Sequence, residues 1–505
     1  MSKIKVIDFA KNVESNRKRL IQNARSKGKY IEDTASLDTA VSINNTIDNL
    51  DDISQKNQVR WINIDGEILQ VDYVDLGASV NNPPNPFYDS EYLEFDGWTK
   101  TSSTDSITGD VDCGALYRTK ADENGRRYNI IKIKLSGYSG LTVNITTKST
   151  ASYTVIVDWG DGAKETFNTS NPALSHSYDK IGQYVIKLWS NYASFAFSIT
   201  QTNIITSVYY GDNCANPNNL KGHTLLECVS FPDVNIKMAS SMFENCYSLR
   251  CLLFPQGCTN VGYYTAQNCY NLTAAILPYA SSNFHYTFTY CVCLSRIIIP
   301  RGLTILGQMA FKRTALTKIF IPNSLTSLDQ GSTSGSTYTP FIECPNLTEI
   351  IFEERAKPLT LGNYTLYGQN FKSVVVPSNV VLGNYVFSSC KNLTHIDLSN
   401  VSSMGSNVLS SCWNLKEVIL PIDFATTFSL AGCNNISKNC IIDICARLKD
   451  LTNTSTLTFT FPSSLRSFME TTYINSLGDV LDDDFEKGIT LVNYLQNKNW
   501  TVSFN

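Results

Sequence analysis

The sequence has few of the residues on which most catalytic and metal sites depend. It contains four histidines in 505 residues, and only 17% of its residues are charged. It lacks the Gly-x-Ser-x-Gly, His-Glu-x-x-His and Gly-x-x-x-x-Gly-Lys-Ser/Thr signatures, and no Gly-x-Gly-x-x-Gly opens a helix after a strand. The scattered histidines argue against a Ser-His-Asp triad. We therefore expect no enzymatic activity, cofactor or metal. The histidines are His176, His223, His285 and His395.

The sequence also lacks a long apolar run. No stretch approaches the ~20 apolar residues of a membrane-spanning helix, so we expect no membrane insertion. No apolar segment follows the basic residues near the start, so we expect no signal peptide. A net charge of −4 leaves no basic stripe for nucleic acid, so we expect no nucleic-acid partner.

What the sequence does contain is a repeat. Each unit has an apolar anchor, two variable residues, and then an apolar, a variable and an apolar residue, often followed by Pro, as in Leu316-x-x-Ile319-x-Ile321-Pro322. A sustained period in the twenties predicts a solenoid, because one unit cannot bury its apolar side alone whereas stacked units share a continuous core. The anchors are Leu226, Leu249, Leu272, Leu294, Leu316, Leu347, Phe371, Leu393, Leu415 and Ile436.

Seven of the 15 cysteines stand three residues before an anchor. One structural demand explains them: a small, polarisable residue that fills the inside of each coil and stays a thiol. We therefore expect thiols rather than disulfides or a zinc site, and assembly in a reducing cytoplasm. These cysteines are Cys246, Cys269, Cys291, Cys344, Cys390, Cys412 and Cys433.

The unit resembles the BspA-type leucine-rich repeat, in which an Ala-Phe-x-x-Cys-x-x-Leu segment precedes a Leu-x-x-Ile-x-Ile-Pro strand. Counted from the anchor, Arg313 and Gly368 replace the cysteine in two units, and an insertion lengthens the unit of Leu347. The inserted residues 329–337 are rich in Gly, Ser and Thr. They are either a binding loop or a harmless insertion.

The strand of each unit carries one feature that a solenoid does not require. The fourth residue after the anchor points away from the core, because side chains alternate along a strand, and it is apolar in seven units. Such an apolar stripe marks an interface, or a neighbouring module of the same chain folds over it. We predict a protein contact through Leu253, Ile276, Ile298, Phe320, Ile351, Val375 and Ile419.

Residues 1–60 are expected to be helical, with one helix over 5–27 and a short second helix that begins near Ser36. An isolated helix of that length is marginal in water, so it either packs on the next domain or serves attachment and self-association. Residues 24–29 and 36–40 resemble the start of tail-fibre-type proteins of gut bacteriophages. The second helix presents at three-four spacing Leu37, Ala40, Asn44 and Ile47.

Two β modules are expected before the solenoid. The segment Phe95-Asp96-Gly97-Trp98 resembles the core of the Listeria–Bacteroides repeat, a small β-grasp-like spacer, which implies that Trp98 is a core residue rather than a sugar platform. Further along, Trp159-Gly160-Asp161-Gly162, followed by a His-x-Tyr and a Gly-x-Tyr-x-Val motif, resembles the PKD domain, an immunoglobulin-like sandwich. Asp158 and Asp161 suggest calcium, but a tight turn needs Asp and Gly for its own backbone, so we predict no metal there.

The period ends near Cys440. A helix is expected at 441–451, a strand at 456–461, and a helix and a strand at the end. This end resembles the terminal element of BspA-type arrays, except that Asn499 stands where a Gly usually precedes the Trp. Terminal caps are needed because the last coil would otherwise expose its core.

The sequence thus predicts a multidomain, mainly β chain. Its parts are N-terminal helices (1–60), a small β-grasp-like domain (61–127), a PKD-like β-sandwich (128–200), a leucine-rich-repeat solenoid (201–440) and an α+β C-terminal cap (441–505). We interpret this plan, typical of elongated interaction proteins, as a non-enzymatic bacteriophage virion protein, a fibre or tail-associated protein assembled in the host cytoplasm. Its N-terminus would contact other virion proteins and form a homo-oligomer, and its solenoid would bind a host-surface protein or glycan. The alternative is a BspA-like bacterial cell-surface adhesin.

Overall fold

The computed structural model describes most of the chain from residue 57 onward. The described residues are 57–75, 78–86, 88–89, 91–99, 111–137, 141–148, 152–170, 172–192, 195–212, 219–232, 236–255, 258, 260–278, 284–299, 302–328, 338–474 and 489–505. The predicted N-terminal helices, with the attachment candidates Leu37, Ala40, Asn44 and Ile47, and the inserted loop 329–337 lie outside these residues.

The chain divides into two compact units, and the first comprises Met1–Ile62, Ile68–Pro84 and Lys100–Cys113. Its described part contains an antiparallel hairpin of β1 (Asn57–Ile62) and β2 (Ile68–Val74). Trp61 is fully buried, and its indole N–H donates to the Asp72 carboxylate at 2.7 Å.

The second unit comprises Asn63–Glu67, Asn85–Thr99 and Gly114–Asn505. It begins with a second hairpin, formed by β3 (Leu93–Trp98) and the part of β4 (Val111–Thr119) that follows residue 113. Trp98 is only 8% exposed and packs edge-on against Phe95, so its prediction as a core residue is confirmed.

A β-sandwich follows the hairpin. Alternating buried and half-buried residues, as in β7, place one face of each strand in the core. One sheet has the order β13-β12-β5-β10-β7-β8 and the other the order β11-β6-β9. The strands are β5 (Asn129–Leu135), β6 (Thr142–Lys148), β7 (Tyr153–Asp158), β8 (Lys164–Thr169), β9 (Ala173–Ser177), β10 (Gly182–Ser190), β11 (Ala196–Ile199), β12 (Ile205–Tyr209) and β13 (Cys228–Ser230).

The sandwich is continuous with the solenoid. Strand β12 pairs antiparallel with β5 of the sandwich and parallel with β13 of the first coil. The buried apolar residues likewise form one cluster that runs from Ile131 to Trp500 without a break. The sandwich therefore covers the open end of the first coil, which is the role of an N-terminal cap.

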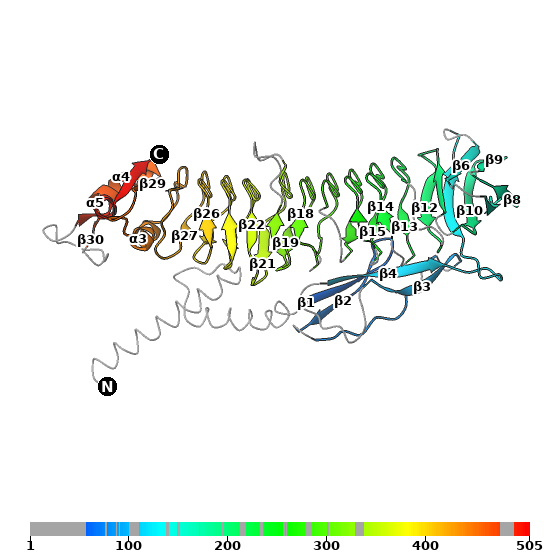
Figure 1. Ribbon diagram of the computed structural model, residues 1–505, viewed down its shortest axis with the longest axis horizontal. Coiled ribbons are helices and arrows are strands. Elements are labelled where there is room, and N and C mark those ends of the chain that lie inside the picture. Colours follow the sequence, from blue (N-terminus) through cyan, green and yellow to red (C-terminus); the bar gives the residue numbers. More distant parts are fainter. Residues whose placement is uncertain are drawn as a thin grey trace, which may run out of the picture. The chain divides into compact units, whose positions relative to one another are not determined.

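Most coils of the solenoid contribute two short parallel strands, where the sequence predicted one. In the coil of Leu294 the anchor-side strand is reduced to a single bridge between Ile276 and Ile298. Figure 1 shows the coils side by side from β13 to β27. Inward side chains stack from coil to coil, as where the rings of Phe288, Phe311 and Phe341 follow one another at 5.6 and 5.7 Å. The anchor-side strands are β13, β15 (Cys251–Leu253), β17 (Ala274–Ile276), β19 (Lys318–Ile321), β21 (Glu349–Phe352), β23 (Ser373–Val375), β25 (His395–Asp397) and β27 (Glu417–Ile419).

In each coil that has one, the strand of the second row comes just before the double turn described below. Its pairs are two to three residues long and parallel, as in Leu359–Leu361 with Val380–Leu382. Its strands are β14 (Lys237–Met238), β16 (Asn260–Val261), β18 (Ile305–Leu306), β20 (Ser327–Leu328), β22 (Leu359–Leu361), β24 (Val380–Leu382), β26 (Ser403–Met404) and β28 (Phe428–Ser429).

Between the two strands most coils make a double turn with two left-handed residues, usually four apart, whereas the turns before Cys344 and Cys433 have one each, Glu343 and Gly432. Tyr264 and Asn268, both at φ +61°, are one such pair. Left-handed backbone costs a non-glycine residue roughly 1–2 kcal/mol, and stacking offsets this cost because the turn amides bond the next coil. The amides of Ser241, Phe243 and Asn245 donate to carbonyls one coil later at 2.7–2.9 Å.

The C-terminal cap closes the other end of the solenoid. The sheet β28-β29-β32 continues the second strand row, and Trp500 is buried against it. The helix and strand predicted at 441–451 and 456–461 correspond to α3 and β29. Asn499 lies at φ +64°, which explains why a glycine suits this position and why Asn is tolerated. The elements are α3 (Lys438–Arg447), β29 (Leu457–Phe461), η2 (Ser463–Leu465), α4 (Arg466–Thr471), β30 (Tyr473–Ile474), β31 (Ile489–Thr490), α5 (Leu491–Asn497) and β32 (Trp500–Phe504).

Candidate recognition surface

The acidic residues at the Trp-Gly-Asp-Gly turn form hydrogen bonds with other groups of the sandwich. The Oδ1 atoms of Asp158 and Asp161 each accept a backbone N–H at 3.1 Å, and Nε2 of His176 lies 2.6 Å from Oδ2 of Asp161. Burial opposes ionisation of Asp161, but the contacts from His176 and the Ala163 amide hold the pKa of Asp161 below its ordinary value. Among the described residues, no group of three or more His, Cys, Asp or Glu side chains is placed to hold a metal ion.

The repeat cysteines form a ladder inside the solenoid. The thiol of Cys269 donates to the carbonyl of Phe243, one coil earlier, at 3.1 Å. Burial raises the pKa of the Cys246 and Cys390 thiols to about 12, so the S–H stays available as a donor. The position therefore selects a small buried donor. The same contact is made by Cys246, Cys291, Cys344, Cys390, Cys412 and Cys433.

Three of the ten coils lack this cysteine. The buried His223 stands at its position in the first coil, after Gly222 at φ +78°, and the structure identifies the replacements in the other two coils. The residue before the cysteine has positive φ in the regular coils, and Arg313 and Gly368 have that conformation. The cysteine position is therefore taken by the next residues, Thr314 and Gln369, rather than by Arg313 and Gly368 as counting from the anchor indicated. The amide of Gln369 donates to the carbonyl of Phe341 at 3.1 Å, the same inter-coil contact that a thiol makes.

The predicted outward stripe divides into two parts. Leu253 and Ile276 are only 6% and 7% exposed, because Gly114 of β4 lies against them. A Cβ atom at Gly114 would lie 2.8 Å from the Leu253 side chain and 3.0 Å from that of Ile276. Ser230 of the first coil also donates to the carbonyl of Tyr117 on β4 at 2.9 Å. At this end of the stripe a neighbouring module of the same chain, the β3–β4 hairpin, covers the apolar residues, which was the alternative to a contact with another protein.

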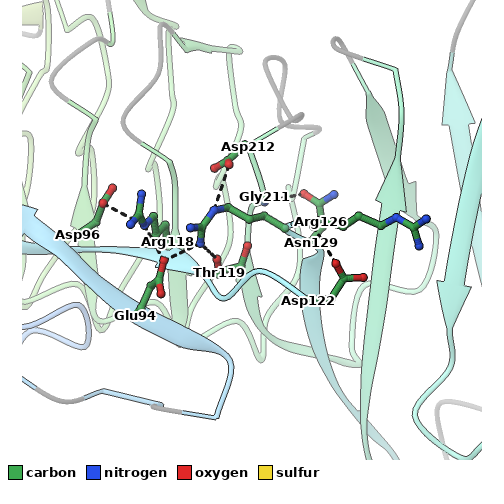
Figure 2. A network of polar contacts seen from close by, with 10 residues as sticks. Glu94, Asp96, Arg118, Thr119, Asp122, Arg126, Asn129, Gly211 and Asp212 are labelled. Atoms are coloured by element: carbon green, nitrogen blue, oxygen red, sulfur yellow. Dashed lines mark hydrogen bonds and ion pairs between the residues drawn. The ribbon is translucent and has the colours of Figure 1, made fainter. Parts of the chain in front are cut away.

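A network of ion pairs connects the β3–β4 hairpin to the segments beside β5 and β12, and Figure 2 shows part of this network. Arg127, which precedes β5, pairs with Glu94 of β3 at 2.7 Å and with Asp212, which follows β12, at 3.3 Å. Arg118 of β4 pairs with Glu94 at 2.7 Å and with Asp96 at 3.2 Å. Partly exposed pairs stabilise little individually, but together they connect the β3–β4 hairpin to the segments beside β5 and β12 within the second unit.

The rest of the stripe is more open. Val375 is 60% exposed, and four further residues are half-buried. Phe320 and Ile351 are direct neighbours on β19 and β21. This part of the predicted stripe consists of Ile298, Phe320, Ile351, Val375 and Ile419.

The exposed aromatic side chains of the solenoid gather elsewhere, on the double turns. We call this side the turn face; it consists of residues 240–247 and the equivalent turns up to 406–413. The rings of Tyr247 and Tyr270 stack at 5.0 Å, and Nζ of Lys391 lies 4.7 Å from the ring centre of Trp413, which is 52% exposed. The solenoid core is complete without these rings. In the described part of the solenoid they are Tyr247, Tyr263, Tyr270, Tyr338, Tyr367 and Trp413.

A groove of about 510 Å³ opens on the turn face beside Gly368. Neighbouring coils carry Glu343 and Ser389 at the same position of the turn, whereas a Cβ at Gly368 would meet nothing within 4 Å. Glu343 pairs with Arg313 and, at 3.5 Å, with Lys312. Burial opposes the ionisation of Glu343, but these cations hold its pKa below the ordinary value.

One residue that lines this groove carries a buried polar atom without a partner. Gln369 is 3% exposed and lines the groove, and its Oε1 accepts no hydrogen bond. An unsatisfied buried acceptor costs roughly 1–3 kcal/mol. The fold needs only a donor at this position, and cysteine supplies that donor in seven other coils.

Sequence reasoning missed the turn face. Tyr247, Tyr270 and Trp413 all stand two residues before an anchor, so the period itself contained the signal. Gln369 was not recognised at the cysteine position because it stands two residues before its anchor, Phe371, whereas the cysteines stand three residues before theirs. Only the backbone conformation of Gly368 shows the shift.

Parallel coils with inward apolar residues and a cysteine ladder define a leucine-rich-repeat solenoid. A family model described as a BspA-type leucine-rich repeat region, present in six copies, matches residues 216–339, 337–437 and 359–478, together just over half of the chain. The chain belongs to this BspA-type leucine-rich-repeat family.

Several solved structures are also similar. A leucine-rich repeat protein from Bacteroides ovatus ATCC 8483 is 13% identical, with 61% of this chain and 96% of that chain covered and a TM-score of 0.22. A leucine-rich repeat protein of T. pallidum is 19% identical, covering 43% and 84%, with a TM-score of 0.22. A leucine-rich cell surface protein from Faecalibacterium prausnitzii A2-165 is 15% identical, covering 61% and 91%, with a TM-score of 0.26. No curated protein matches the chain, and no helix among the described residues is long and apolar enough to cross a membrane.

Proposed function

We propose that the chain is a non-enzymatic binding protein that recognises its partner through the turn face of the solenoid. The observation that carries the proposal is the set of six exposed aromatic side chains on the turns of a solenoid whose core does not need them. Large aromatic side chains dominate binding energy at protein interfaces. The coils are stacked and capped at both ends, so the surface is ordered before binding and little conformational entropy is lost.

The open part of the stripe is a second contact surface. Phe320, Ile351 and Val375 present apolar surface on the anchor-side strands, and such surface favours a protein partner. The covered residues Leu253 and Ile276 are occupied by the chain's own hairpin, so the proposed contact begins at Ile298.

As the setting we propose a bacteriophage virion, in which the chain is a fibre or tail-associated protein that mediates host attachment. The resemblance of residues 24–29 and 36–40 to tail-fibre-type proteins supports this setting. The N-terminal segment would bind other virion proteins and form a homo-oligomer through Leu37, Ala40, Asn44 and Ile47. A BspA-like cell-surface adhesin is the second candidate, and membership of the BspA-type family supports it.

Fractionation separates the two settings. Phage particles are purified from a lysate by density centrifugation, and the chain is located in particles and in cell envelopes by immunogold labelling and mass spectrometry. Labelled projections on particles support the virion setting. Recovery in the envelope fraction alone contradicts that setting and favours the adhesin.

Adsorption to host cells tests the binding surface. Trp413→Ala with Tyr270→Ala should weaken adsorption roughly 30-fold or more, since an interface hot spot contributes about 2 kcal/mol or more. The matched control is Ile422→Ser, which changes a 77% exposed residue outside the turn face and should leave adsorption unchanged. Equal adsorption of wild type and the double variant would exclude the turn face as the contact.

A further inference from the structure

We propose that the groove beside Gly368 binds a carbohydrate, specifically a neutral, polyhydroxylated segment of a surface glycan. The inference rests on the proposed function, because it names the ligand class for one part of the turn face. It stands on four features of the groove: a missing side chain, an acceptor without a partner, a half-exposed guanidinium and an exposed tyrosine ring.

The missing side chain is not a requirement of the fold. Gly368 lies at φ +69°, where glycine is the least strained residue. However, Asn245 and Asn268 occupy the same position of their coils at φ +65° and +61°, and Ser389 does so at φ +60°. The solenoid therefore accepts a side chain here, and its absence at Gly368 is what opens the groove.

The acceptor without a partner points to a ligand that donates hydrogen bonds. Gln369 uses its Nε2 for the inter-coil contact with Phe341, and its Oε1 accepts nothing. A cysteine would make the inter-coil contact without leaving an acceptor unpaired, as it does in the neighbouring coils of Cys344 and Cys390. A ligand hydroxyl at the groove supplies the missing donor.

The charged residues argue against an amine. Arg313 and Lys312 both pair with the single carboxylate of Glu343, which leaves a net positive charge beside the groove. A cationic ligand is therefore disfavoured. The Arg313 side chain is 54% exposed and carries more N–H groups than Glu343 engages.

The remaining wall suits a sugar ring. Tyr367 lines the groove and is 38% exposed, and aromatic rings pack against the C–H face of pyranosides. A sugar hydroxyl donates to an amide oxygen such as that of Gln369 and accepts from a guanidinium such as that of Arg313. An apolar side chain of a protein partner satisfies neither group. The volume of about 510 Å³ falls within the 300–1,000 Å³ usual for small-ligand sites.

The test is binding of the full chain to an array of neutral, uronate-bearing, sialylated and amino-sugar oligosaccharides, followed by calorimetric titration with the best neutral oligosaccharide. Gly368→Asn refills the groove with a residue that the fold already carries at this position. Gln369→Cys restores the ladder thiol and removes the unpaired acceptor. The control is Ser411→Asn, which adds the same side chain at φ +62° two coils away.

We expect the neutral oligosaccharide to bind wild type and Ser411→Asn equally. Gly368→Asn and Gln369→Cys should each weaken binding at least tenfold while the melting temperature stays within a few degrees. If no oligosaccharide binds the wild type, or if both groove variants bind as the wild type does, the proposal is wrong. Preference for a cationic amino sugar, or for a uronate-bearing or sialylated sugar over the neutral one, also overturns it.

Adsorption to host cells separates this failure from failure of the proposed function. If Trp413→Ala lowers adsorption while no glycan binds, the groove proposal falls and the binding function stands. If neither glycan binding nor adsorption responds to any turn-face variant, both fall.

Discussion

The thiol of Cys412 donates a hydrogen bond of 3.1 Å to the backbone carbonyl of Phe387, which lies one coil earlier in the solenoid. The repeated cysteine is thus both a filler of the coil interior and a connection between successive coils. The buried amide of Gln369 makes the same connection where the cysteine is missing. The position therefore recurrently requires a buried side chain that donates a hydrogen bond to the preceding coil.

Replacing Cys412 with Ala should destabilise the solenoid by about 1–2 kcal/mol. The change removes one inter-coil hydrogen bond and leaves a small void, and both effects are of this order. The shift in the urea midpoint at constant slope measures it. Cys293→Ala, at an exposed cysteine, should stay within about 0.5 kcal/mol. Equal shifts for the two variants would show that the ladder adds nothing.

Thiol labelling should follow burial and pH. Burial raises the pKa of Cys246 and Cys390 to about 12 and that of Cys440 to about 11, above the ordinary value of 9.0. At pH 8 the folded chain should therefore react rapidly at Cys293 and slowly at the buried thiols. A thiol-specific chromogenic reagent measures this, in a Cys214→Ser background because residue 214 lies outside the described residues.

The same shifts predict how stability depends on pH. The folded state holds these thiol protons more tightly than the unfolded state does. Their contribution is therefore fully present below pH 9.0 and is lost as the pH rises toward 11 and 12. Urea midpoints should fall from pH 8 to pH 11, and more steeply for wild type than for a Cys246→Ala, Cys390→Ala variant. Parallel curves would contradict the assignment.

A side chain at Gly114 should separate the hairpin from the solenoid. Valine suits a strand, but its Cβ would lie 2.8 Å from the Leu253 side chain. Overpacking of this kind costs typically 1–3 kcal/mol. Hydrogen exchange of β3 and β4 amides measures the loosening. The control is a double-mutant cycle in which Leu253→Ala makes room. The penalty of Gly114→Val should shrink in that background, and an unchanged penalty would show that the two residues do not compete for space.

Truncation of Trp500 should open the C-terminal end of the solenoid. Trp500 is 2% exposed, and its indole N–H donates to the carbonyl of Lys449 at 2.9 Å. Trp500→Ala should cost about 3–5 kcal/mol, as loss of a large buried side chain does, and light scattering should detect association through the uncovered coil. Trp413→Ala removes the same mass from an exposed site and should leave stability nearly unchanged.

The stripe and the turn face make separable predictions. Phe320→Glu with Ile351→Lys places an opposite-charge pair on adjacent strands, so repulsion between the new residues does not arise. If the stripe contacts a partner, this variant should lower partner binding at least tenfold without changing the melting temperature by more than a few degrees. Normal binding would exclude the stripe and leave the turn face as the contact.

Several features could be predicted from local patterns alone. The anchors and cysteines predict stacked coils because each makes its decisive contact with a residue of the neighbouring coil. Trp98 as a core residue was also predicted, and so were a cap helix and a cap strand near 441–451 and 456–461, although the helix begins and ends three to four residues earlier, at Lys438–Arg447. The second strand row was missed because its two- and three-residue strands are too short to show a period-2 pattern. The replacement of cysteine by Gln369 was missed because a one-residue shift is visible only in backbone conformation.

The repeat pattern alone was enough to predict coils stacked around a shared apolar interior, because the information for that choice recurs every twenty-odd residues. What covers the stack became visible only in the folded chain. Gly114 lies on Leu253 although the two are far apart in the chain, and β12 joins the sandwich to the first coil although the sequence predicted that the sandwich ends at residue 200. The physical reason is that coverage depends on which distant surfaces fit together, and no local period encodes that fit.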